Sequence, residues 1–237
     1  MELSATDRQK AIKLLQKYVS HMKKNSVYYT LTYSDGSMDI VLNNRGNEEL
    51  SELGAGGVSG ITAGGTFYQK SETGVYKAES MTSVSILENV LDRALKDPDH
   101  VSVTAVEAGE DDDGNKYTSY RVTFDSAESY IDVYKNFDDD KKQSLVESLK
   151  QTVKQYSNED PKICFEFLAG NDWSLSVYNT IILGDDYILN WYFDGYYEIF
   201  DWNLADGFYD GDADDMQTYD NLLDTELSSL GTMIKVY

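Results

Sequence analysis

Three aspartates near the C-terminus have the spacing that best suits a metal ion. Asp210, Asp212 and Asp214 would supply carboxylates at the first, third and fifth positions of a calcium-binding loop. The sixth position is Asp215 rather than glycine, and the twelfth is Asn221 rather than a bidentate glutamate, which excludes an EF-hand. The sequence predicts no resident cofactor and leaves two interpretations of these aspartates open. They form either a looser calcium site or an acidic turn before a final helix.

Aromatic rings and carboxylates are mixed in the segment 187–202, and this mixture could bind a sugar or a cation. Aromatic rings offer a flat, electron-rich face, and carboxylates accept hydrogen bonds from hydroxyl groups. We expect a hairpin here, with Asp194 and Gly195 in the turn because both tolerate a positive φ. Burial of the rings in the core is the alternative interpretation. The candidate ligand-binding residues are Trp191, Tyr192, Asp194, Tyr197, Glu198 and Trp202.

No set of side chains has the spacing of a known catalytic or zinc centre. His21 and His100 fit no zinc motif, and a single cysteine excludes a disulfide framework. Cys164 lies in an apolar strand context and is expected to be an inert buried thiol. Glycoside hydrolysis needs two carboxylates about 5–10 Å apart, and so acidic a chain offers many unspecific pairs. The sequence leaves enzymatic activity open and favours a non-enzymatic role.

Charge is distributed unevenly along the chain. The 237 residues carry 42 acidic and 20 basic side chains, and this net charge of −22 argues against nucleic-acid binding. Residues 163–234 contain no Lys or Arg, whereas the first 24 residues carry six basic and two acidic side chains. We expect the basic N-terminal helix and the acidic C-terminal half to attract each other. A cationic ligand or a basic protein that binds the acidic half is the alternative. No apolar run is long enough to span a membrane.

Helical periodicity is clearest in residues 6–24, where Thr6 and Gln9 have the spacing of a capping box. The apolar residues of one face recur at helical spacing: Ile12, Leu15, Val19 and Met22. Lysines gather on the opposite face, which we interpret as a solvated face: Lys10, Lys13, Lys17 and Lys24. Similar patterns predict further helices over 84–96, 138–156 and 215–230.

Alternating apolar residues and turn signals predict strands elsewhere, and the glycine-rich residues 44–65 are predicted to form a flexible loop. The predicted strands are 27–33, 38–43, 66–70, 75–79, 101–108, 117–124, 163–168, 174–182, 187–193, 196–202 and 232–237. Because tight turns join neighbouring strands, the sheet should be antiparallel. The expected fold class is α+β: a curved antiparallel β-sheet, a half-barrel-like meander of hairpins, with about four helices packed on one face. We expect one domain over 1–237, with a soft division near 125–160.

Four short segments carry a resemblance to bacterial surface lipoproteins. They are residues 27–33 (VYYTLTY), 38–41 (MDIV), 65–70 (GTFYQK) and 74–79 (GVYKAE). In these segments and in the order of its elements over 6–124, the chain resembles the mature part of proteins in the LolA/LppX-like superfamily. The resemblance implies an N-terminal helix and an antiparallel sheet that folds half-way round inner helices. It further implies either an apolar hollow for a lipid or acyl chain or no assigned role, and it brings no catalytic residues.

Three functional hypotheses follow. The first is a non-enzymatic extracytoplasmic binding or scaffold domain of a bacterial surface protein, with a lipid, a glycan or a basic protein as the open ligand classes. The second is an acidic cytoplasmic immunity-type antagonist of a basic toxin. The third is a carbohydrate-binding or carbohydrate-acting protein. An extracellular or cell-surface location is expected if a leader was removed before Met1, and a cytoplasmic one if Met1 is the native start.

Overall fold

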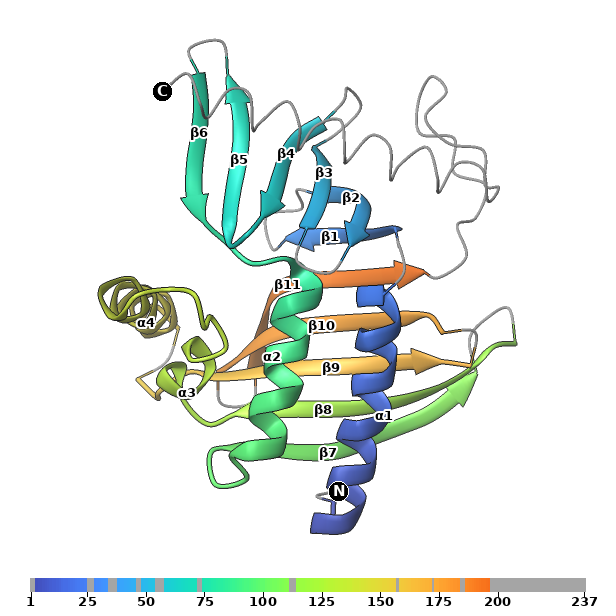
Figure 1. Ribbon diagram of the computed structural model, residues 1–237. Helices are drawn as coiled ribbons and strands as arrows, with labels where there is room; N and C mark the ends of the chain where they lie inside the picture. The colour runs from blue at the N-terminus through green and yellow to red at the C-terminus, as the bar shows by residue number, and fades with distance from the viewer. Residues whose placement is uncertain are drawn as a thin grey trace.

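A single antiparallel sheet forms the frame of the molecule (Figure 1). The computed structural model describes residues 3–24, 28–33, 38–45, 48–53, 58–71, 74–110, 114–156, 158–171, 173–183 and 186–196. Within these residues, eleven strands pair in the order β6-β5-β4-β3-β2-β1-β11-β10-β9-β8-β7. The expected α+β class with an antiparallel sheet is confirmed. The predicted helix over 215–230 and the predicted strand over 232–237 lie outside the described residues.

The strands form two runs that are separated along the chain by the second helix. The first run contains β1 (Tyr28–Tyr33), β2 (Met38–Arg45), β3 (Glu48–Leu53), β4 (Val58–Ala63), β5 (Thr66–Ser71) and β6 (Gly74–Glu79). The second run contains β7 (Val101–Glu110), β8 (Lys116–Phe124), β9 (Lys162–Gly170), β10 (Leu175–Leu183) and β11 (Asp186–Tyr196). The two runs join where β1 pairs with β11, with Leu31 opposite Phe193. The first and last described strands of the chain therefore meet in the middle of the sheet.

The described helices are α1 (Ala5–Lys24), α2 (Ser83–Lys96), α3 (Ala127–Ile131) and α4 (Asp139–Lys154). The helices predicted over 6–24, 84–96 and 138–156 are confirmed as α1, α2 and α4, and α3 was not predicted. The capping box predicted at Thr6 is wrong, because Thr6 lies inside α1 and the backbone N–H of Asp7 donates to Oγ of Ser4 at 3.2 Å. Thr82 caps α2 and Asp138 caps α4 in the same way, each by accepting a backbone N–H.

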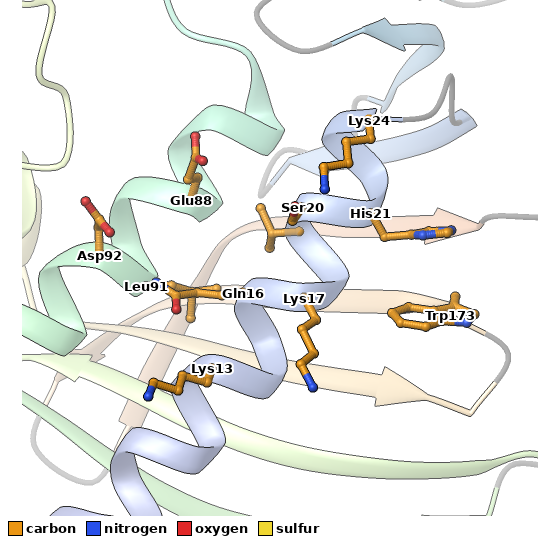
Figure 2. Close-up of a pocket in the computed structure, with 11 residues that line it drawn as sticks. Lys13, Gln16, Lys17, Ser20, His21, Lys24, Glu88, Leu91, Asp92 and Trp173 are labelled. Atoms are coloured by element: carbon orange, nitrogen blue, oxygen red, sulfur yellow. The ribbon is translucent and has the colours of Figure 1, made fainter.

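The apolar faces of α1 and α2 pack in one core with residues of strands β7–β10 (Figure 1). The buried face of α1 consists of Ala11, Ile12, Leu15, Val19 and Met22, as its helical spacing predicts. These side chains share one core with α2 and with three phenylalanines of β8 and β9: Phe124, Phe165 and Phe167. The face of α1 that carries Lys13, Lys17 and Lys24 is turned away from the strands and is exposed (Figure 2).

The flexible loop predicted over 44–65 is wrong for the described part of this segment, which contains all of β3 and β4, while residues 46–47 and 54–57 lie outside the described residues. Glu49 and Leu50 of β3 pair with Thr62 and Ile61 of β4. Gly60 packs against the ring of Phe67, and a Cβ atom at this position would displace that ring. At Gly60 the missing side chain leaves room for a ring of the neighbouring strand, which composition alone does not distinguish from loop flexibility.

The turn predicted at Asp194 and Gly195 is also wrong. Both residues lie inside β11, and Gly195 pairs with Tyr29 of β1 on one side and with Leu175 of β10 on the other. Pairing on both sides keeps the backbone extended through a sequence that favours a turn in isolation. The second predicted strand of this hairpin, at 196–202, lies outside the described residues except for Tyr196.

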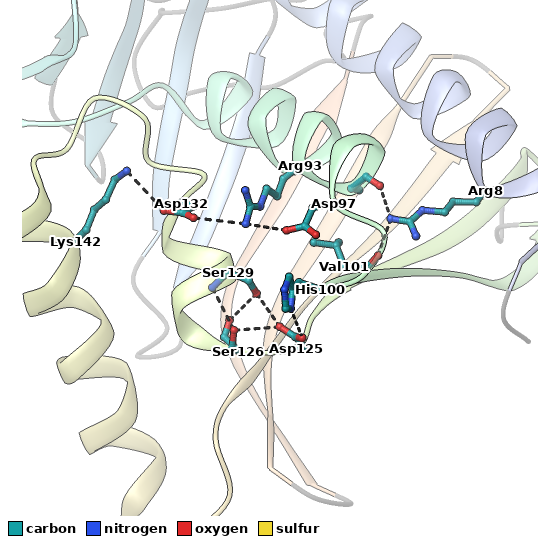
Figure 3. Close-up of polar contacts among 11 residues, drawn as sticks. Arg8, Arg93, Asp97, His100, Val101, Asp125, Ser126, Ser129, Asp132 and Lys142 are labelled. Atoms are coloured by element: carbon teal, nitrogen blue, oxygen red, sulfur yellow. Dashed lines mark hydrogen bonds and ion pairs between the residues drawn. The ribbon is translucent and has the colours of Figure 1, made fainter. Parts of the chain in front are cut away.

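Arg8 ties the start of α1 to the end of α2 and the start of β7 (Figure 3). Its guanidinium donates to the backbone oxygen of Ala94 in a short hydrogen bond, to that of Val101 at 2.6 Å and to that of Pro98 at 3.4 Å. The oxygen of Ala94 belongs to the last turn of α2, where backbone acceptors lack helical partners. One side chain thus satisfies acceptors from two elements.

We expect Arg8→Met to lower the free energy of unfolding by about 1–3 kcal/mol, because methionine keeps an apolar stem but loses the charge-assisted hydrogen bonds. Urea denaturation followed by circular dichroism measures this loss. Lys10→Met is the matched control, since Lys10 pairs with Asp7 on the exposed surface. Equal denaturation midpoints for the two variants would show that Arg8 does not anchor α1.

Candidate functional site

An open pocket of about 610 Å³ lies on the outer face of α1, between α2 and the turn that joins β9 to β10 (Figure 2). Six residues of α1 that line it recur at helical spacing and therefore share the face opposite the core: Lys13, Gln16, Lys17, Ser20, His21 and Lys24. Glu88, Leu91 and Asp92 of α2 line one side, and Trp173 lines the other. The periodicity that buries one face of α1 thus presents its lysines to this pocket.

Trp173 lies in the β9–β10 turn with a φ of 72°, and among the described residues it alone combines a positive φ with a side chain. This left-handed conformation costs a residue with a Cβ atom about 1–3 kcal/mol. The turn is held by hydrogen bonds from the backbone N–H of Trp173 to Gly170 at 3.3 Å and from the backbone N–H of Gly170 to Ser174 at 3.0 Å. The backbone N–H of Asn171 also donates to Lys116 of β8 at 2.9 Å. The surrounding structure therefore imposes the conformation of Trp173.

The turn is also fixed to α1 by Tyr18, whose hydroxyl donates to the backbone oxygen of Gly170 at 2.6 Å. The rings of Trp173 and His21 stack with centroids 4.7 Å apart and an interplanar angle of 20°. The ring of Tyr18 is tilted against the same indole at 5.0 Å. Trp173 nevertheless stays 41% exposed. Its indole is a fixed aromatic surface that a ligand in the pocket can reach.

The lysines and the carboxylates of the pocket differ in their ion pairs. Among the described residues, no carboxylate pairs with Lys13, Lys17 or Lys24. Glu88 instead lies 2.5 Å from Lys23, which is outside this pocket.

Asp92, the other carboxylate of the pocket, lies 2.9 Å from Lys96 and 3.4 Å from Lys135. Partial burial raises the pKa of Asp92, but the hydrogen bonds and charges of Lys96 and Lys135 outweigh burial and leave this pKa lowered. Asp92 therefore stays ionised with its charge compensated. Because both carboxylates are compensated by lysines outside the pocket, the three lysines within it give the pocket a positive potential.

The arrangement can bind an anion and stack a ring. In the part of the chain that the structure describes, no group of three or more His, Cys, Asp or Glu side chains could hold a metal ion. The predicted calcium ligands Asp210, Asp212 and Asp214 lie outside that part.

Three of the six ligand-binding residues predicted from the sequence lie on a described strand. Trp191, Tyr192 and Asp194 lie on β11, opposite Asn179, Tyr178 and Ser176 of β10. Tyr197, Glu198 and Trp202 lie outside the described residues, so their exposure stays a prediction. The expected attraction between α1 and the acidic C-terminal half stays a prediction for the same reason.

Sequence reasoning did not identify this pocket, although two signals of it were visible. The lysine spacing on α1 indicates a solvated face without indicating a ligand, and Trp173 follows a turn-forming segment that starts at Gly170. Cys164 is buried, as predicted, and burial raises the pKa of its thiol. In the described residues, no helix is long and apolar enough to cross a membrane.

The chain matches no protein-family model, no curated protein and no solved structure. The functional argument therefore rests on the geometry of the pocket and on the physical chemistry of its residues.

The strain at Trp173 predicts an unusual order of stability among substitutions. Trp173→Gly should be more stable than Trp173→Ala by about 1 kcal/mol, because glycine adopts a positive φ without cost and both variants lose the ring. Urea denaturation of the two variants measures the difference. At Ser176, a β10 residue in extended strand, the same pair of substitutions should favour alanine. If alanine is also the more stable residue at position 173, the turn is not strained.

The contact between His100 and Asp125 predicts that the stability of the protein depends on pH. Its Nδ1 atom lies 2.9 Å from Oδ2 of Asp125 (Figure 3), and this hydrogen bond raises the pKa of His100 above 6.5. A raised folded-state pKa gives stability that is complete below the unfolded value and is lost as pH rises through the folded value. Between about pH 5.5 and pH 8, the melting temperature of the wild type should fall more than that of His100→Gln. Identical slopes in the two proteins would contradict this coupling.

Proposed function

We propose that this chain is a non-enzymatic binding domain of a bacterial surface protein, and that the pocket on α1 binds a ligand with a ring and a negative charge. The observation that carries the proposal is the position of Trp173, held at a φ of 72° with its indole exposed beside the lysines of α1. Backbone strain at Trp173 and repulsion among the lysines of α1 both lower stability, and a binding role accounts for both.

The lysines add a second cost that a bound anion would remove. Lys13 and Lys17 are four residues apart on α1, and like charges at this spacing destabilise a helix by about 0.2–0.5 kcal/mol. α1 carries six basic residues and one acid, a net charge of +5 in a chain whose net charge is −22. An anionic ligand would neutralise the part of this charge that faces the pocket.

The extracytoplasmic location and the likeness to surface lipoproteins are part of the proposal. The order of α1, an antiparallel sheet and α2 supports them, and we propose that the sheet curves half-way round the helices. The described core does not favour a lipid as the ligand. Phe124, Phe165 and Phe167 fill the space between the helices and β8–β9, and an acyl chain there would have to displace them.

An immunity-type antagonist of a basic toxin is the second candidate. The absence of Lys and Arg from residues 163–234 favours it, because such a segment attracts a basic protein. That role requires salt-sensitive binding of a basic protein to this acidic segment and does not involve the lysines of α1. The two candidates therefore use oppositely charged parts of the chain.

The anionic dye 8-anilinonaphthalene-1-sulfonate tests the proposal, because it combines aromatic rings with one sulfonate. We expect saturable dye binding, measured by fluorescence. The affinity for the dye should fall at least about tenfold in Trp173→Gly and in Lys17→Gln. Tyr156→Ala is the matched control, since Tyr156 is 66% exposed and lies beyond the end of α4. Equal affinity in the wild type and in both pocket variants would refute the pocket as the binding site.

A further inference from the structure

We infer that the ligand of the α1 pocket is a small anionic sugar, a monosaccharide that carries a phosphate or a carboxylate. The inference rests on the proposed function, because it names the ligand class of the same pocket. Three features of the pocket carry it: its hydroxyl-binding side chains, its single stacking surface and its local charge.

Hydroxyl-binding groups lie beside the lysines. Gln16 and Ser20 face the space between α1 and α2 (Figure 2), and hydrogen bonds among the described residues use neither side chain. An amide and a hydroxyl each donate and accept, which matches the hydroxyl groups of a sugar. The carboxylates of Glu88 and Asp92 add acceptors on the α2 side. A ligand without hydroxyl groups would leave these polar groups to water.

The stacking surface suits a sugar ring. The C–H groups on one face of a pyranose carry a partial positive charge and pack on the electron-rich face of an indole. Trp173 is already stacked on His21, so one ring at a time can pack against its exposed area. The pocket volume of about 610 Å³ is within the range of small-molecule sites, about 300–1,000 Å³.

The charge distribution favours a small anion over a polymer. The positive potential of Lys13, Lys17 and Lys24 is local, since charges are screened beyond about 8 Å at physiological ionic strength. A long polyanion would extend beyond the pocket and meet a protein whose net charge is −22. A single phosphate or carboxylate stays within reach of the lysines.

Isothermal titration calorimetry of the full chain tests the ligand class with five probes: glucose 6-phosphate, glucuronate, glucose, inorganic phosphate and adenosine monophosphate. We expect glucose 6-phosphate or glucuronate to bind at least about tenfold more tightly than glucose or phosphate, because only they use both the lysines and the hydroxyl-binding groups. If inorganic phosphate binds as tightly as the acidic sugars, the pocket is a simple anion site and the sugar inference is wrong. Tighter binding of adenosine monophosphate would mean that the indole stacks a nucleobase.

Two pocket substitutions and one control connect binding to the named residues. Lys17→Gln should lower the affinity for the preferred acidic sugar about tenfold. Lys10→Gln should leave this affinity unchanged, since Lys10 pairs with Asp7 outside the pocket. Ser20→Ala should lower the affinity for the acidic sugar and leave the affinity for the dye unchanged. If the dye binds through Trp173 and no sugar binds, the sugar inference fails and the proposed function stands. If neither the dye nor any sugar binds, both fail.

Discussion

The burial of one face of α1 is the constraint on which the rest of the site depends. Ile12, Leu15, Val19 and Met22 are removed from water against α2 and the sheet, and each contributes about 1.5–3 kcal/mol of hydrophobic stabilisation. A helix with one face fixed in this way has no rotational freedom. The opposite face must be solvent-facing, and the lysines at helical spacing on it must gather beside α2 and the β9–β10 turn. The position of the pocket is a consequence of the core.

The second requirement is that the β9–β10 turn stays against α1. The hydrogen bond from Tyr18 to Gly170 and the stacking of Trp173 on His21 connect the turn to the helix from two directions. Together with the link from Asn171 to Lys116, these contacts stabilise the left-handed backbone at Trp173. A more favourable residue, glycine, would relieve the strain but would remove the indole from the pocket.

Local and overall charge have opposite signs in this protein. A net charge of −22 governs encounters at long range, while the lysines of α1 govern what happens within one screening length of the pocket. Glu88 and Asp92 do not cancel the lysines, because each is neutralised from outside the pocket by Lys23, Lys96 or Lys135. Ion pairs around the pocket therefore determine its sign as much as the residues that line it.

Elements with local signals could be predicted from the sequence. Periodicity placed α1, α2 and α4, and alternation placed most strands, because each signal lies within a few residues along the chain. Tertiary structure alone decided the features that need a distant partner. β11 continues through Asp194 and Gly195 because β1 and β10 pair with it on both sides, and residues 48–53 form a strand because β2 and β4 flank them. The site follows the same rule: the lysine face was visible in the sequence, but about 150 residues separate it from the tryptophan that completes the pocket. Only the packing of α1 on the sheet brings the two together, because contacts between distant segments leave no periodic trace in either one.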